Sequence, residues 1–177
     1  VVQRMADARV AGVVQTVNVA RGDLGELVVN AGLGLGEGVV AGAAAADLVT
    51  VLKPAGGDGG GDEPLRFTYL VADKPVQVVR DERRGSGTRL VETLYHQRLR
   101  PALEYVELDE LVRRCLQLER AYGYPLDLEF AVEGQRLWLL QARPIGTFWG
   151  EFTESLARHP LAAAPRGGRR LRPGANP

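Results

Sequence analysis

The chain has 177 residues, enough for one domain with a proper core, and its composition is that of an ordinary globular protein, with 45% hydrophobic and 25% charged residues. The net charge is zero, so charge alone gives no reason to expect nucleic acid or an anionic membrane as a partner. No apolar run reaches the roughly 18 residues of a membrane-spanning helix. The single cysteine, Cys115, excludes an internal disulfide and indicates a reducing compartment, so we expect a cytoplasmic location.

The first apolar segments of the chain are Val1–Met5 and Val13–Val17, and their valine content favours strands. The chain has no initiator Met, and its first segment reads as the middle of a strand. We therefore expect a fragment whose first half is missing. Glu26–Asn30 is the next predicted strand.

A glycine-rich run follows from Ala31 to Gly42. Alternating glycines let a backbone approach a ligand closely or adopt a positive φ. The run matches neither the phosphate-binding pattern that ends in Gly-Lys-Ser/Thr nor the Gly-x-Gly-x-x-Gly of dinucleotide-binding folds. A tight turn between two elements is the alternative explanation, and Glu37 would then be an acidic residue at the start of a short helix.

The middle of the chain predicts strands at 47–53, 67–72 and 76–80, with a flexible glycine-rich loop at 54–64. Residues 88–103 show helical spacing of Leu90, Leu94 and Leu99, which Pro101 interrupts. His96 lies in this segment and is interpreted as a surface or packing residue.

The clearest predicted helix is Asp109–Tyr122, where apolar residues recur at intervals of three and four. Asp109 is a candidate for its N-terminal cap, and Gly123 for its end. Cys115 lies on the apolar stripe, which indicates a buried, inert thiol.

A hairpin follows the helix, because apolar and polar residues alternate along 126–131 and again after Glu133-Gly134. A five-residue loop, 133–137, would set Glu129 opposite Gln141 and Asp127 opposite Arg143. A bulge at Gly134 would have the same effect, whereas a two-residue Glu-Gly loop would turn Gln141 into the apolar layer. In the favoured register, the apolar face of the second strand consists of Trp138, Leu140 and Ala142.

This register would give the hairpin a chemistry of its own. Directly opposed Cβ atoms lie roughly 4.5–5.5 Å apart. The carboxylate of Glu129 and the amide oxygen of Gln141 would then share one hard cation, and Arg143 would hold a phosphate oxygen. The hairpin is therefore a candidate platform for a magnesium nucleotide. The alternative is a surface hairpin with solvated charges.

The stretch 122–130, followed by 139–145, resembles the end of the ATP-binding domain of the phosphoenolpyruvate synthase and pyruvate phosphate dikinase family. The signature of that family at this point is a Glu followed by Gln-x-Arg-Pro, and rifampicin phosphotransferases share it. The resemblance implies that Glu129 and Gln141 bind Mg²⁺ and that Arg143 contacts the phosphates of ATP.

Three other segments resemble the same family. A Val-Gln-x-Met strand lines its nucleotide pocket, which makes Gln3 a candidate contact to adenosine. Its Gly-Leu-Gly-Glu hallmark lies near the active site, which makes Glu37 a further candidate. Its Gly-Val-x-Phe-Thr-x-Asn-Pro motif is altered here, because Gln15 replaces the aromatic residue and Val19 replaces the proline.

The resemblance implies an α+β fold for 1–146, the C-terminal part of an ATP-grasp-like domain with a mostly antiparallel sheet and flanking helices. Residues 147–177 read as a linker or disordered tail. The family's upstream lobe carries a phosphate-binding lysine and a further arginine, and a separate domain carries a phosphohistidine. We expect neither in this chain.

The implied function is to hold Mg-ATP for phosphoryl transfer to that histidine and then to an acceptor such as pyruvate. We expect the chain by itself to bind nucleotide weakly at most and to be inactive. The alternatives are a non-catalytic nucleotide-binding or structural module, and a relative that acts on an antibiotic or a glucan.

Overall fold

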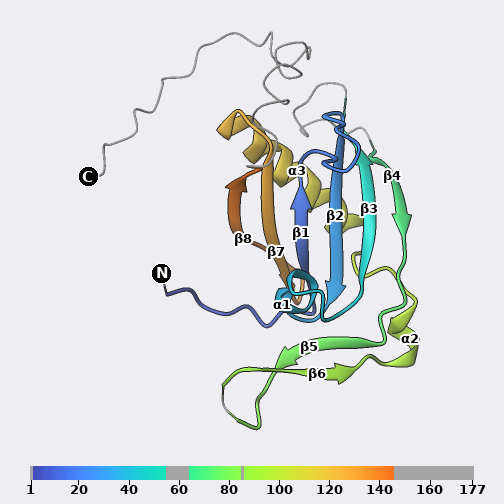
Figure 1. The fold of residues 1–177 in the computed structure, drawn as a ribbon, viewed down its shortest axis with the longest axis vertical. Helices are drawn as coiled ribbons and strands as arrows, with labels where there is room; N and C mark the ends of the chain where they lie inside the picture. Colours follow the sequence, from blue (N-terminus) through green and yellow to red (C-terminus); the bar gives the residue numbers. More distant parts are fainter. Residues whose placement is uncertain (1, 55–63, 85, 146–177) are drawn as a thin grey trace. The chain divides into compact units, whose positions relative to one another are not determined.

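The computed structural model of the protein describes residues 2–54, 64–84 and 86–145 (Figure 1). Its largest element is a six-stranded sheet in which every pair of neighbours is antiparallel, in the order β4-β3-β2-β1-β7-β8. The strands of this sheet are β1 (Val10–Gln15), β2 (Glu26–Leu33), β3 (Ala46–Leu52), β4 (Arg66–Leu70), β7 (Leu126–Glu133) and β8 (Arg136–Pro144).

The remaining elements within the described residues are a two-stranded hairpin and three helices. They are β5 (Val76–Arg80), β6 (Thr88–Glu92), α1 (Gly36–Val40), α2 (Tyr95–Arg98) and α3 (Tyr105–Tyr122). The predicted α+β class with a mostly antiparallel sheet is confirmed. Among the described residues, no helix is long and apolar enough to cross a membrane.

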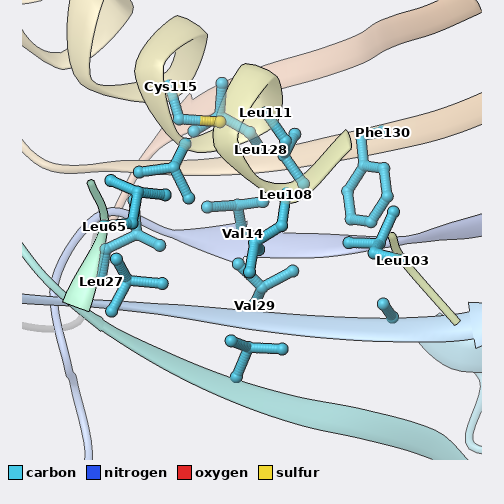
Figure 2. Close-up of a cluster of buried hydrophobic side chains, with 14 of the residues drawn as sticks. Val14, Leu27, Val29, Leu65, Leu103, Leu108, Leu111, Cys115, Leu128 and Phe130 are labelled. Carbon is cyan, nitrogen blue, oxygen red and sulfur yellow. The ribbon is translucent and has the colours of Figure 1, made fainter. Parts of the chain in front are cut away.

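The hydrophobic core lies between α3 and one face of the six-stranded sheet. Figure 2 shows side chains of α3 facing those of the strands across this layer, with Leu108, Leu111 and Cys115 on the helix side. Val10 and Val14 of β1 and every second residue of β7 join them, because side chains alternate between the two faces of a strand. The alternate residues of these strands point to the opposite face of the sheet, part of which α1 covers.

The predicted helix is confirmed over most of its length, but it begins at Tyr105 instead of Asp109. The backbone N–H of Glu104 donates to the Glu107 carboxylate at 3.0 Å, as in a capping box, while Asp109 pairs with Arg113 one turn later. Gly123, at φ 77°, ends the helix as predicted. Cys115 is buried as predicted, and burial raises the pKa of its thiol to about 12.

Two predicted elements are wrong. Residues 2–8 lie in no strand, so the expected strand at Val1–Met5 is not formed there. The expected helix at 88–103 is instead β6, followed by the short helix α2, because β6 pairs with β5 over its whole length. Leu90, Leu94 and Leu99 are exposed, so their helical spacing marked no buried stripe.

Several sequence-based predictions fall on residues outside the described ranges. They concern the glycine-rich part of the 54–64 loop, at 55–63, and the 147–177 tail. His96, in contrast, is described and lies exposed on α2, as predicted.

A buried ion pair anchors the start of the β5–β6 hairpin to the large sheet. Lys74 Nζ lies 2.5 Å from the Asp47 carboxylate, and both side chains are fully buried. Asp47 also accepts hydrogen bonds from the Tyr69 hydroxyl and from the backbone N–H groups of Ala72 and Ala102. Burial and the adjacent Asp47 charge raise the pKa of Tyr69.

The glycine-rich run is explained by close packing against β5. Gly34 has φ 80°, and a Cβ there would overlap the carbonyl oxygen of Val78. The N–H of Leu35 donates to the same carbonyl oxygen at 2.8 Å, and Gly38 lies against the Val78 side chain. The strand-to-helix turn, which the sequence left as one of two explanations, therefore accounts for these glycines.

Candidate functional site

The β7–β8 hairpin has the predicted polar pairs, but its turn and its bulge differ from the predicted ones. Glu129 is the partner of Gln141, and Asp127 is the partner of Arg143. The connection is a two-residue turn, Gly134-Gln135, so the predicted five-residue loop is wrong. A bulge after Glu129 leaves Leu140 without a partner in β7 and restores the register.

The bulge also changes which residues of β8 face the core. Leu137 and Leu139 pack against it, opposite Val132 and Phe130. The prediction that Trp138 and Leu140 would do so is wrong, because it assumed an unbroken alternation through β8. The Trp138 ring instead lies under the Arg136 guanidinium, 5.0 Å from ring centroid to Cζ.

The two polar pairs lie on the sheet face opposite α3. Leu126, Leu128 and Phe130 of β7 belong to the core, so Asp127 and Glu129 point to the other face. Gln141 and Arg143 share that face with their partners, since directly opposed residues lie on the same side of a sheet. The structure thus presents two carboxylates, one carboxamide and one guanidinium on two adjacent strands.

Arg143 is held by Asp127. Its Nε donates to Asp127 Oδ2 at 2.9 Å, and its Nη2 lies 2.8 Å from the same oxygen. The Asp127 side chain is 18% exposed and the Arg143 side chain is 59% exposed, so the carboxylate is largely covered while much of the guanidinium faces solvent. This leaves the guanidinium oriented and accessible to an anion.

The Glu129–Gln141 pair lies one step along the strands from Asp127 and Arg143. Glu129 is half-buried and Gln141 is exposed. No cluster of three or more His, Cys, Asp or Glu side chains suited to a metal ion occurs in the described part of the chain. A cation at this pair would therefore need oxygen atoms from a ligand or from water in addition to the two side chains.

Gln3 lies beside this pair. Its Nε2 donates to the Leu140 carbonyl oxygen, at 3.5 Å, so it contacts the backbone of the bulge next to Gln141. Further along the same segment, the N–H of Asp7 donates to the Glu133 carboxylate at 3.0 Å. That hydrogen bond, with Arg4 nearby, lowers the pKa of Glu133. The N-terminal segment is thus attached to β7 and β8, although it is not a strand.

Glu37 lies in the first turn of α1, as the alternative interpretation of its sequence predicted. Its carboxylate accepts a hydrogen bond from the Thr88 hydroxyl at 2.9 Å. Gly36, in the same helix, approaches Ala11, whose side chain is on the face opposite α3. The helix therefore borders the candidate site, while the Glu37 side chain bonds to the β5–β6 hairpin.

Sequence reasoning did not identify Gln15 and Asn30 as neighbours of the site. Val10 and Val14 of β1 belong to the core, so Val13 and Gln15 face the other way. Gln15 is the partner of Asp127, and Val13 is the partner of both Glu129 and Asn30. The alternation within β1 was readable in the sequence, but the pairing of β1 with β7, which lies far along the chain, was not.

The comparison with protein families gives one match over most of the chain. Residues 1–159 match the family described as pyruvate phosphate dikinase, AMP/ATP-binding domain. The match includes β7 and β8, which carry the two polar pairs.

Curated relatives agree with this match. A probable phosphoenolpyruvate synthase of Methanocaldococcus jannaschii is 36% identical over 148 residues, which cover 83% of this chain and 12% of that protein. The prodigiosin synthesizing transferase PigC of Serratia marcescens is 38% identical over 147 residues, covering 83% and 15%. The phosphoenolpyruvate synthase of Pyrococcus furiosus is 32% identical over 163 residues, covering 86% and 18%. The matched region is thus a small part of each relative, and the chain belongs to the pyruvate phosphate dikinase AMP/ATP-binding domain family.

Proposed function

We propose that this chain is the metal- and phosphate-binding part of the ATP-binding domain of a larger phosphotransferase. In this proposal, the domain is ATP-grasp-like and spans residues 1–146, and it holds Mg-ATP on the sheet face opposite α3. An upstream lobe supplies the rest of the phosphate contacts. The phosphoryl group passes to a histidine on another domain and then to an acceptor such as pyruvate.

The observation that carries the proposal is the register of the β7–β8 hairpin. It pairs Glu129 with Gln141 and Asp127 with Arg143 on one face of the sheet. An acceptor-rich pair beside a guanidinium matches the two needs of a magnesium triphosphate, which are oxygen ligands for the cation and donors for phosphate oxygens.

The donor set fits Mg²⁺. This ion keeps several waters and is usually bound by one or two carboxylates together with substrate phosphates, so a complete protein cage is not required. Glu129 and Gln141 would hold it, and when bound it would neutralise charge on the phosphates. Arg143, oriented by Asp127, would bind and position a phosphate oxygen. Gln3 would contact the adenosine side, and Glu37 would border the site.

Phosphoryl transfer depends on positioning and on charge neutralisation from several sides. The described residues supply one such side, from β7 and β8. We therefore expect the chain by itself to bind Mg-ATP weakly and to transfer no phosphate.

The identity of the acceptor is a separate question. The relatives that share this domain carry names as different as phosphoenolpyruvate synthase and prodigiosin synthesizing transferase. A domain shared by proteins with such different names is better explained by a common step that uses ATP than by recognition of the acceptor. Pyruvate is one acceptor, and an antibiotic or a glucan are others. A cytoplasmic location is part of the same proposal.

The proposal is tested by calorimetric titration of Mg-ATP into the full-length protein that carries this chain, beside Glu129→Ala and Arg143→Ala. Micromolar binding that is lost in both variants would support it. Unchanged Mg-ATP affinity in both variants would refute the assignment of the site to these residues. No binding by the full-length wild-type protein would favour the second candidate, a structural module that has kept the fold without the nucleotide.

A further inference from the structure

The polar surface of the candidate site continues onto a third strand. Gln15, the last residue of β1, is the partner of Asp127 on the side away from β8. Asp127 thus has Arg143 on one side and Gln15 on the other. Neighbouring strands lie about 4.8 Å apart, so the three side chains form a line about 10 Å long across the sheet. We call Arg143, Asp127 and Gln15 the phosphate row.

Gln15 is half-buried, and its carboxamide makes no hydrogen bond to the described residues. Its other strand neighbour is Val28 of β2, which offers it no polar group. No described residue forms a hydrogen bond with the Gln15 side chain. The next residue, Thr16, differs in this respect, because its buried hydroxyl accepts a hydrogen bond from the N–H of Leu126 at 2.8 Å.

A half-buried carboxamide without a protein partner has both its donors and its acceptor free for a ligand. We infer that Gln15 is a ligand-contacting residue that donates a hydrogen bond from its amide nitrogen to the polyphosphate of a bound nucleotide. This inference rests on the proposed function and adds a third strand to its site.

The position of Gln15 favours phosphate over the cation as its contact. The cation ligands Glu129 and Gln141 lie in the next row, where β1 contributes only the apolar Val13. The phosphate row contains one guanidinium, and the Asp127 beside it carries a negative charge that opposes an anion. The amide of Gln15, on the far side of Asp127, is a neutral N–H donor. It offers a polyphosphate a second hydrogen bond without adding a charged group to the site.

Asn30 is a further amide on this face, and its place is less favourable. It is separated from Glu129 by Val13, and its outer neighbour is the exposed Leu48 of β3. Gln15, in contrast, directly adjoins a member of the polar pairs.

The test is calorimetric titration of Mg-ATP into the full-length protein and into Gln15→Met and Gln15→Leu, two variants of similar volume without hydrogen-bonding groups. A hydrogen bond to a charged group predicts a rise in Kd of about ten-fold in both variants. Gln77→Met, the same exchange on β5 outside the site, is the matched control and is expected to bind as the wild type does. Thermal unfolding midpoints check that all variants are folded.

A second arm identifies the part of the nucleotide that Gln15 contacts. Tripolyphosphate with Mg²⁺ competes against a fluorescent ATP analogue, and its inhibition constant is expected to rise by the same factor in the Gln15 variants. An effect on ATP without an effect on tripolyphosphate would place the contact on the nucleoside and overturn the phosphate assignment.

The failure of this inference is distinguishable from the failure of the proposed function. If Glu129→Ala abolishes Mg-ATP binding while both Gln15 variants bind like the wild type, the site stands and the role of Gln15 is refuted. If the wild-type protein does not bind Mg-ATP, the proposed function fails and the inference fails with it.

Discussion

Arg143 and Asp127 form a cross-strand ion pair in which Nε and Nη2 of the arginine lie 2.9 and 2.8 Å from a single carboxylate oxygen. The pair lies at the end of the hairpin away from its turn, on the face opposite α3. Exposed pairs of this kind contribute about 0–1 kcal/mol to stability. The orientation of the guanidinium is therefore the more important consequence of the pairing.

Arg143→Ala is expected to raise the Kd for Mg-ATP at least ten-fold, because a charge-assisted contact to phosphate is lost. It is expected to change the free energy of unfolding by less than about 1 kcal/mol. Titration calorimetry and urea denaturation measure the two quantities. Arg143→Lys should recover only part of the affinity, since an ammonium group cannot reproduce the planar fork of arginine.

The control for this variant is Arg114→Ala, which removes another exposed, ion-paired arginine, on α3. It should leave Mg-ATP affinity unchanged. Equal losses in the two variants would indicate a general effect of charge and would contradict a specific role for Arg143.

Exchanging the two members of the metal pair provides a second prediction. Glu129→Gln leaves two amides and should abolish metal-dependent nucleotide binding, because Mg²⁺ prefers at least one carboxylate. The double variant Glu129→Gln with Gln141→Glu returns one carboxylate to the directly opposed position. It should recover part of the affinity, as measured by titration of Mn²⁺ followed by electron paramagnetic resonance. A double variant no better than the single one would refute cation sharing by the pair.

Removing the cation of the buried pair should be far more costly than removing an exposed one. Lys74→Met leaves the buried Asp47 carboxylate without its charged partner, and we expect a loss of about 3–5 kcal/mol in the free energy of unfolding. Arg98→Met makes the same kind of exchange in the more exposed pair with Asp73. It should cost far less, because an ion pair in contact with solvent contributes little to stability. Comparable losses in urea denaturation would contradict the structural role of Lys74.

Two glycines with similar backbone angles should respond differently to alanine. Gly34 and Gly87 have φ 80° and 84°. A Cβ at Gly34 would overlap the Val78 carbonyl, whereas a Cβ at Gly87 would have no atom within 4 Å. Gly87→Ala should cost about 1 kcal/mol, the penalty of the left-handed conformation. Gly34→Ala should cost clearly more and weaken hydrogen-exchange protection of β5, and equal costs would contradict the close packing.

The thiol of Cys115 makes stability depend on pH in the alkaline range. Burial, followed by the charge of Glu119, raises its pKa from 9.0 to about 12. Between these values, the unfolded chain has lost a proton that the native chain retains, so the free energy of unfolding falls as pH rises, by about 1.4 kcal/mol per pH unit for one such group. Stability measured against pH should fall less steeply in Cys115→Ala than in the wild type.

Labelling provides a second measurement of the same property. A disulfide reagent at pH 8 should modify Cys115 only when the chain unfolds, because a buried neutral thiol is unreactive. Rapid labelling of the native protein would contradict its burial.

The sequence predicted best those elements whose signal is local. The stripe of apolar residues along 109–122 is long enough to identify α3, since a helix satisfies its backbone hydrogen bonds within the segment. The segment 88–103 has similar spacing but is a strand and a short helix. The pairing of β6 with β5 decided the structure of this segment. The spacing of apolar residues along the segment carries no information about that pairing.

The hairpin register combines local and non-local causes. The sequence was sufficient to propose Glu129 opposite Gln141, because only that register keeps the polar residues together. It was not sufficient to place the bulge at Leu140, because no residue type in this stretch indicates a bulge. The bulge brings Leu137 and Leu139 to the core in place of Trp138 and Leu140.

The sequence by itself determined the class of the fold, the helix α3 and the residue types of the candidate site, because periodicity and motif spacing are properties of adjacent residues. The tertiary structure decided which strands are neighbours, and so it placed Gln15 beside Asp127 and buried Lys74 against Asp47. Such contacts join residues far apart in the chain. Their energies depend on burial and register, which exist only once the sheet has formed.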